Sequence, residues 1–156
     1  MQITRTAVLV KPDGLQRGLI GEIIARFERK GLKLVGLKMV RMTDEMLDQW
    51  YTEHREKSFF KNLKDFMGSM PIVAMAWEGI DVVPVVRKLV GTTLGREAEG
   101  GSIRGDFGMS QQMNLIHASS NNGDAEREIG IVFNADELFN YHSILEAVVY
   151  AEGEAE

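Results

Sequence analysis

Position 117 carries one of only three histidines in the chain, and its neighbours suit a nucleophile. His117 follows the apolar pair Leu115 and Ile116, and the small residues at 118–120 leave room for a bulky group beside the ring. An imidazole near its usual pKa of about 6.5 is largely neutral and nucleophilic at pH 7. A histidine at the end of a strand can equally be a hydrogen-bonded structural residue, so the position alone leaves both readings open.

A nucleophilic histidine needs its second ring nitrogen held, and Glu128 on the next predicted helix is a plausible orienting carboxylate. The alternative is that Glu126 and Glu128 belong to the solvated helix face "DAEREI", in which Arg127 provides ordinary charge mixing. The spacing of these residues does not decide between the two.

The glycine-rich stretch at 91–105 invites comparison with phosphate-binding loops, but the known motifs are missing. Neither G-x-x-x-x-G-K-[ST] nor a G-x-G-x-x-G after a strand occurs. A phosphate would therefore have to be held by side chains, and guanidinium groups suit its oxygens. The candidate donors, each of which could instead be an ordinary surface residue, are Lys11, Arg87, Thr93 and Arg104.

Two adjacent aromatic residues, Phe59 and Phe60, stand at the start of a predicted short helix. Both cannot face the core, so one is expected to be exposed and available for stacking on a base or a partner, with simple burial as the alternative. His54 and His142 lie in polar, helical surroundings without metal-ligand spacing, and we interpret both as surface histidines.

The elements that would position these residues alternate between strand and helix. Apolar runs predict strands, and 3.6-residue periodicity with Thr43 as an N-cap predicts helices. The predicted strands are 5–11, 32–42, 71–77 and 114–118, and the predicted helices are 18–30, 43–55, 59–67, 81–90 and 124–133. A turn is expected at 12–14, after the first strand, and the glycines at 91–105 predict a long loop. This order indicates an α/β or α+β fold like a split βαβ sheet with helices on one face.

Length and composition fit one ordinary globular domain covering residues 1–156, with an acidic flexible tail at about 151–156. The chain is 44% hydrophobic and carries a net charge of -5, which argues against a broad nucleic-acid or anionic-membrane surface. It has no cysteine, and we recognise no signal peptide or membrane-spanning run. We therefore expect a cytoplasmic protein.

Taken together, five segments resemble the nucleoside diphosphate kinases, in the order found in that family. The resemblance runs from about residue 5 to residue 150, and K-P-D-G followed far downstream by N-x-x-H is a specific pair. The segments are "VKPDGLQRGLIGEII" at 10–24, "REKSFFKNL" at 55–63, "VAMAWEG" at 73–79, "SIRGDFG" at 102–108 and "NLIHAS" at 114–119.

The resemblance implies transfer of the terminal phosphate of a nucleoside triphosphate, typically ATP, to a nucleoside diphosphate through phosphohistidine at His117. It implies a ping-pong mechanism and Mg²⁺ bound mainly through the nucleotide phosphates. It also implies a ferredoxin-like sandwich with an antiparallel four-stranded sheet, usually assembled as a hexamer.

The same resemblance assigns roles to the remaining site residues by position. Lys11 and Asn114 match residues that contact the sugar hydroxyl and nearby phosphate oxygens. The phosphate grip is matched by Arg87, Thr93 and Arg104, and the base contacts are matched by Phe59 and Leu63. The residues that support the histidine are matched by Tyr51, Ser119 and Glu128.

Two segments depart from the family pattern. The loop that contributes to trimer contacts, at 93–101, commonly has Asn-Pro after its threonine, whereas this chain has Leu94 and Gly95. Ser120 stands where an aspartate is common. The alternatives to a kinase are a catalytically silent nucleotide-binding or regulatory module on the same fold and a different phosphotransferase or hydrolase.

Overall fold

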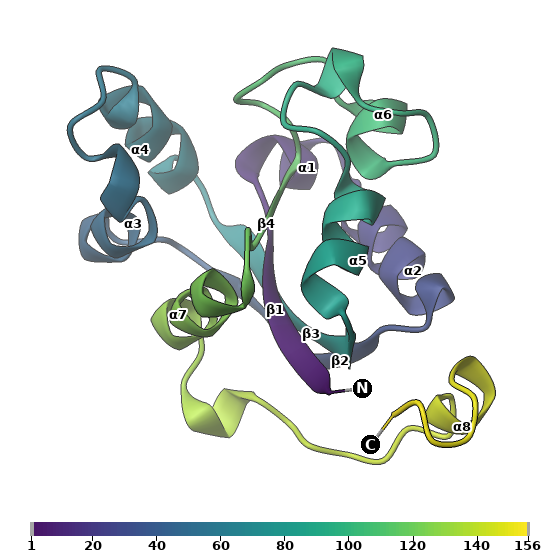
Figure 1. Cartoon of the computed structure of the whole chain (residues 1–156). Helices are drawn as coiled ribbons and strands as arrows, with labels where there is room; N and C mark the ends of the chain where they lie inside the picture. The colour runs from purple at the N-terminus through teal and green to yellow at the C-terminus, as the bar shows by residue number, and fades with distance from the viewer. Residues whose placement is uncertain (1, 156) are drawn as a thin grey trace.

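A four-stranded antiparallel sheet forms the centre of the computed structural model, which describes residues 2–155 (Figure 1). The strand order is β2-β3-β1-β4, which confirms the predicted ferredoxin-like arrangement. The strands are β1 Ile3–Val10, β2 Lys33–Val40, β3 Ile72–Ile80 and β4 Ile116–Ala118. The helices are α1 Pro12–Gln16, α2 Ile20–Lys30, α3 Asp44–Trp50, α4 Phe60–Gly68, α5 Val82–Val90, α6 Ile103–Phe107, α7 Asn122–Val132 and α8 Glu146–Val149, and the short 3₁₀ helices are η1 Thr52–His54, η2 Gly95–Glu97 and η3 Ala135–Glu137.

Both faces of the sheet are covered, so the expectation of helices on one face only was wrong. Val8 and Val10 of β1 pack with α2 and α5, whereas the alternate residues Ala7 and Leu9 pack with α3, α4 and α7. Figure 1 shows α2 and α5 on one side of the strands and α3, α4 and α7 on the other. A strand buried on both faces is apolar at nearly every position, as β1 is over residues 7–10.

The pairing of β1 with β4 fixes the direction of the candidate nucleophile. His117 lies opposite Leu9 in the antiparallel register, so both side chains leave the same face of the sheet. That face carries α3 and α7, while the neighbours Ile116 and Ala118 are buried in the cluster on the opposite face. Ile116 and Ala118 therefore anchor the strand on one face, and the imidazole of His117 points to the other face.

Three local predictions need correction. The stretch after the first strand, expected to be a turn, is the short helix α1, with a proline at its start where a missing N–H costs little. The glycine-rich stretch expected to be a loop contains α6, because Ser102 caps it by accepting a hydrogen bond from the Gly105 N–H. Asn114 and Leu115 precede the last strand and are not part of it.

The C-terminal segment packs only in part. The Tyr150 hydroxyl accepts a hydrogen bond from the Ile80 N–H at 3.2 Å, which ties α8 to the end of β3. Residues 151–154 are exposed, and the last residue of the predicted tail, Glu156, lies outside the described residues. Within residues 2–155, no helix is long and apolar enough to cross a membrane.

Candidate active site

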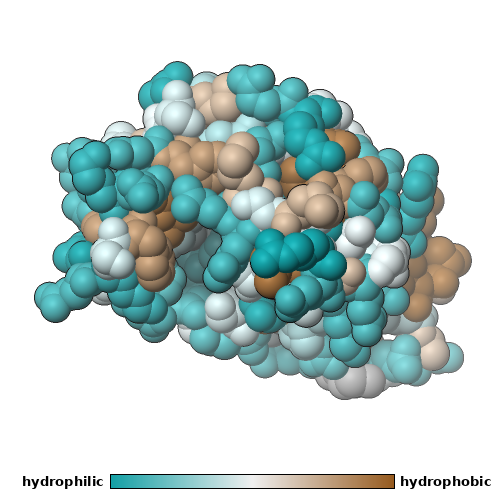
Figure 2. Space-filling model, turned by 90° about the horizontal axis from the view of Figure 1, so that it is seen from above, coloured by the Kyte–Doolittle hydropathy of each residue, from teal (hydrophilic) through white to brown (hydrophobic). Residues whose placement is uncertain are grey.

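A cavity of about 640 Å³ lies beside β4. From above, the surface is hollowed next to the lobe formed by α3 and α4, and mainly hydrophilic residues surround the hollow (Figure 2). The cavity brings together nearly all the predicted site residues from separate elements, and Ser119 lies directly behind it. The predicted residues that line it are Lys11, Tyr51, Phe59, Leu63, Arg87, Thr93, Arg104, Asn114, His117 and Glu128.

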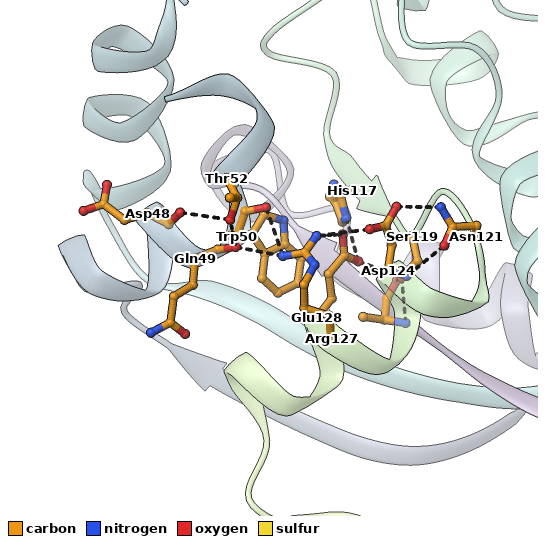
Figure 3. Close-up of polar contacts among 11 residues, drawn as sticks. Asp48, Gln49, Trp50, Thr52, His117, Ser119, Asn121, Asp124, Arg127 and Glu128 are labelled. Atoms are coloured by element: carbon orange, nitrogen blue, oxygen red, sulfur yellow. Dashed lines mark hydrogen bonds and ion pairs between the residues drawn. The ribbon is translucent and has the colours of Figure 1, made fainter. Parts of the chain in front are cut away.

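The imidazole of His117 is held from one side by a carboxylate. Its Nε2 lies 3.0 Å from Oε2 of Glu128 on α7, and the Ser119 hydroxyl donates to the same oxygen at 2.7 Å (Figure 3). Glu128 is buried, so it is not the solvated residue of the alternative reading. Because an ionised carboxylate only accepts, Nε2 must carry the hydrogen and Nδ1 is left with its lone pair.

Two aromatic residues enclose this pair. The ring of Trp50 meets the His117 ring edge-on, with centroids 5.1 Å apart. Burial raises the pKa of Tyr51 far above its usual value, and the negative charge of Glu128 adds to this effect. The phenol of Tyr51 therefore stays protonated at neutral pH and can donate a hydrogen bond.

Lys11 and Asn114 form a buried polar pair at the floor of the cavity. The Lys11 ammonium donates to Oδ1 of Asn114 at 2.7 Å and to the Gln112 carbonyl at 3.3 Å. Burial, with a smaller contribution from nearby Arg104, lowers the pKa of Lys11 to about 8, and Asp13 partly opposes this change. An anion in the cavity would restore the preference for the charged form.

Arg104 is a second buried cation at the floor, and backbone carbonyls hold it. Its guanidinium donates to the carbonyl oxygens of Asn114 at 3.2 Å, Gly91 at 3.1 Å and Ile116 at 2.6 Å. Burial and the positive charge of Arg87 lower the pKa of Arg104 to about 10, so it remains charged at pH 7. These cations make the floor suited to bind an anion such as a phosphate chain.

The outer part of the cavity is more open. Arg87 and Thr93 are exposed, and so is Phe59, whose side chain retains 45% of its accessible surface. Leu63 is half-buried on α4, while Phe60 packs against the core. The prediction that one of the two adjacent phenylalanines is exposed is therefore confirmed.

Sequence reasoning missed several residues that line the cavity, among them Trp50, His54 and Arg127. His54 is no simple surface residue, because its ring lies 6.0 Å from that of Tyr51 and 5.5 Å from that of Phe59. Its Nδ1 is buried and has no hydrogen-bond partner among the described residues. The available signal was the position of His54 three residues after Tyr51, a spacing that brings two side chains together on a helical turn. His142, in contrast, is exposed as predicted.

The two departures from the family pattern have distinct structural settings. Ser120 is exposed at the cavity edge, and Asn121 beside it caps α7 by accepting from the Asp124 N–H. Gly95 packs against Gly108, where an added Cβ would come within 2.5 Å of the Gly108 carbonyl carbon. The altered loop thus uses a glycine where close backbone approach demands one.

No group of three or more His, Cys, Asp or Glu side chains in residues 2–155 is arranged to hold a metal ion. Carboxylates that line the cavity are nevertheless present. Glu128 is already engaged by His117 and Ser119, and Asp124 by Asn121 and Arg127, which leaves Glu53 as a further carboxylate at the cavity.

Comparison with known proteins gives one consistent result. The family model described as "Nucleoside diphosphate kinase" matches residues 4–138. A nucleoside diphosphate kinase of Staphylothermus marinus is 52% identical over 90% of this chain and 100% of its own length, and one of Archaeoglobus fulgidus is 51% identical over 95% and 98%. The solved structure of a halophilic nucleoside diphosphate kinase from Halobacterium salinarum in complex with CDP superposes with a TM-score of 0.92, at 48% identity, over 94% of this chain and 98% of that one.

Proposed function

We propose that His117 is the group that carries the phosphate, since the chain belongs to the nucleoside diphosphate kinase family and is a phosphotransferase of that kind. The observation that supports this assignment most directly is the 3.0 Å contact between His117 Nε2 and Glu128. It holds the ring in the tautomer whose other nitrogen can attack, in a cavity large enough for a nucleotide.

In the first half-reaction, the lone pair of His117 Nδ1 attacks the terminal phosphorus of a nucleoside triphosphate such as ATP. The N–P bond forms while the bond from phosphorus to the bridging oxygen breaks, and the nucleoside diphosphate leaves with that electron pair. The ring becomes cationic, and Glu128 stabilises the charge through the hydrogen on Nε2. A terminal oxygen of a second nucleoside diphosphate then attacks the phosphorus, and the N–P bond breaks.

Phosphoryl transfer requires alignment of the reacting atoms and neutralisation of the charge on the moving group. Lys11 and Arg104 supply positive charge from the buried floor, and Arg87 supplies it from the exposed side. Asn114 and Thr93 add neutral polar groups, and by the family match Lys11 and Asn114 also contact the sugar hydroxyl. Because one pocket serves both nucleotides in turn, the kinetics are ping-pong.

Mg²⁺ fits this donor set as an ion that arrives with the nucleotide. Mg²⁺ usually keeps several waters and binds substrate phosphates with only one or two carboxylates. Glu53 at the cavity would accept hydrogen bonds from its waters. When bound, the ion neutralises negative charge on the phosphate oxygens.

The base has few polar partners in this arrangement. Phe59 offers an exposed ring face and Leu63 an apolar contact, and stacking of this type accepts any base. We therefore expect broad nucleotide tolerance, together with the hexameric assembly and cytoplasmic location that the family resemblance implies.

Labelling distinguishes this function from the alternatives. Incubation with ATP labelled on its terminal phosphate should place label on the protein in an acid-labile, alkali-stable bond, and GDP should then remove it. His117→Ala should abolish the label while leaving the fold intact by circular dichroism. Nucleotide binding without label would instead indicate the silent module, and label that survives His117→Ala would overturn the assignment.

A further inference from the structure

Leu115, two residues before His117, has an unusual backbone conformation. Its φ is 75°, a value that non-glycine residues rarely adopt. The Ile116 N–H donates to the Asn114 carbonyl at 2.9 Å, so Leu115 is the central residue of a γ-turn of the strained, positive-φ type. Strained backbone of this kind persists only where the surrounding structure enforces it.

The surroundings that enforce this turn come from the segment 11–14, about a hundred positions earlier in the sequence. The buried carboxylate of Asp13 accepts the Leu115 N–H at 2.9 Å, and the Lys11 N–H donates to the Leu115 carbonyl at 2.8 Å. A Cβ added at Gly14 would lie 2.7 Å from the same carbonyl oxygen. Both polar backbone groups of Leu115 are thus fixed by K-P-D-G.

The two residues that flank the turn hold the anion-binding groups. The carbonyls of Asn114 and Ile116 accept from Arg104, and the Asn114 side chain accepts from Lys11. His117 follows directly. A change in the backbone of Leu115 would therefore move the acceptors of both buried cations and the nucleophile together.

Within residues 2–155, the carboxylate of Asp13 makes no hydrogen bond besides the one to Leu115. Its Oδ2 has the Leu115 N–H as its hydrogen-bond partner, and within residues 2–155 no group pairs with its buried Oδ1. A buried carboxylate is costly to desolvate. Its one hydrogen bond goes to the strained residue of the site, where a charged acceptor binds an N–H more strongly than a neutral one.

We propose that Asp13 is a positioning residue: by holding the Leu115 N–H it maintains the strained turn and so places His117, Asn114 and Arg104 for phosphoryl transfer. This inference rests on the proposed role of His117. It assigns Asp13 no contact with the nucleotide.

Single-turnover labelling at saturating ATP tests the proposal. Asp13→Ala removes the acceptor, and we expect the rate of phosphohistidine formation to fall by about tenfold to a hundredfold, the effect of losing a charge-assisted hydrogen bond. Asp13→Asn keeps an acceptor oxygen, so its rate should stay within about threefold of the parent. Rates are compared well below the Lys11 pKa of about 8, so that loss of the Asp13 charge does not deprotonate Lys11.

Glu137→Ala is the matched control. This carboxylate also accepts a backbone N–H, that of Asn134 at 2.8 Å, but it does not line the cavity. It should lower thermal stability without slowing phosphorylation, which separates a positioning effect from general destabilisation.

Three results would overturn the proposal. The first is an Asp13→Ala protein that folds and is labelled at the parental rate. The second is an Asp13→Ala protein that loses nucleotide affinity but keeps the parental labelling rate at saturating ATP. The third is a folded Asp13→Asn protein whose labelling is as slow as that expected for Asp13→Ala. If Asp13→Ala does not fold, the rate of Asp13→Asn decides. Failure of the parent protein to take up label would instead overturn the role of His117.

Discussion

The floor of the pocket and its rim hold their side chains in different ways. At the floor, Lys11, Arg104 and Asn114 are buried and hydrogen-bonded to one another or to backbone carbonyls. At the rim, Phe59 and Arg87 are exposed. For the proposed function, the floor is therefore preorganised to hold the phosphate chain common to every substrate, whereas the rim is free to adapt to different bases.

The largest expected effect lies at the floor. Arg104→Ala removes a buried charge and leaves three backbone carbonyls without this donor. Charge-assisted hydrogen bonds are worth about 1.5–3 kcal/mol each, so kcat/KM should fall about a hundredfold or more, and the melting temperature should also fall. Steady-state kinetics and thermal melts measure the two effects.

Arg104→Lys serves as the control for charge, because lysine cannot serve three acceptors with a planar fork. It should recover only part of the loss. Full recovery would show that the carbonyl contacts do not matter, and the distinction between a preorganised floor and an adaptable rim would lose its basis.

The second effect concerns the orientation of the nucleophile. Glu128→Gln keeps the side-chain size but removes the charge that fixes the proton on His117 Nε2. Carboxylates that orient a histidine typically contribute about 10–100-fold, so labelling at saturating ATP should slow by that factor, with little change in nucleotide affinity. Ser119→Ala, which leaves the carboxylate charged, should have a smaller effect. An unchanged rate in Glu128→Gln would contradict this role.

The third prediction uses pH. Burial lowers the pKa of Lys11 from 10.5 to about 8, so the free enzyme loses this positive charge as pH rises through about 8. Since kcat/KM reports the free enzyme, it should fall on the alkaline side near that pH. A bound nucleotide raises the pKa of Lys11 again, so kcat should fall only at higher pH.

A variant checks that Lys11 is responsible. Lys11→Arg stays charged throughout the range and should lose the alkaline decline near pH 8, although its lower overall activity reflects a poorer fit to the floor. A decline that persists unchanged in Lys11→Arg would assign it to another group.

The sequence predicted the regular elements of the fold better than the backbone at the site. Local patterns were enough for the four strands and for the cap at Thr43, whose side chain accepts from the Met46 N–H as expected. They failed at Asn114 and Leu115, which were predicted as strand. In the γ-turn there, the Leu115 N–H donates to Asp13, a residue about a hundred positions away, and no local pattern contains such a contact.

At the site, the family resemblance pointed to residues of which nearly all line one cavity in the structure. His54 was not among them, because only packing against Tyr51 and Phe59 makes it part of the cavity. Coverage of both sheet faces was overlooked although residues 7–10 of β1 are apolar without alternation, and α6 was missed because glycines around it suggested a loop.

The smallest effect is expected at the rim. Phe59 is 45% exposed, so its replacement by alanine should leave the fold unchanged and remove a stacking surface. Stacking is worth about 1–3 kcal/mol per base, and the exposed position favours the lower end, so KM should rise about fivefold to tenfold while kcat is kept. Phe59→Tyr retains the ring and should behave like the parent. Because stacking does not read hydrogen-bonding groups, the rise should be similar for ATP and CTP. A loss confined to one nucleotide, or a fall in kcat as large as that of Arg104→Ala, would mean that the rim is as preorganised as the floor.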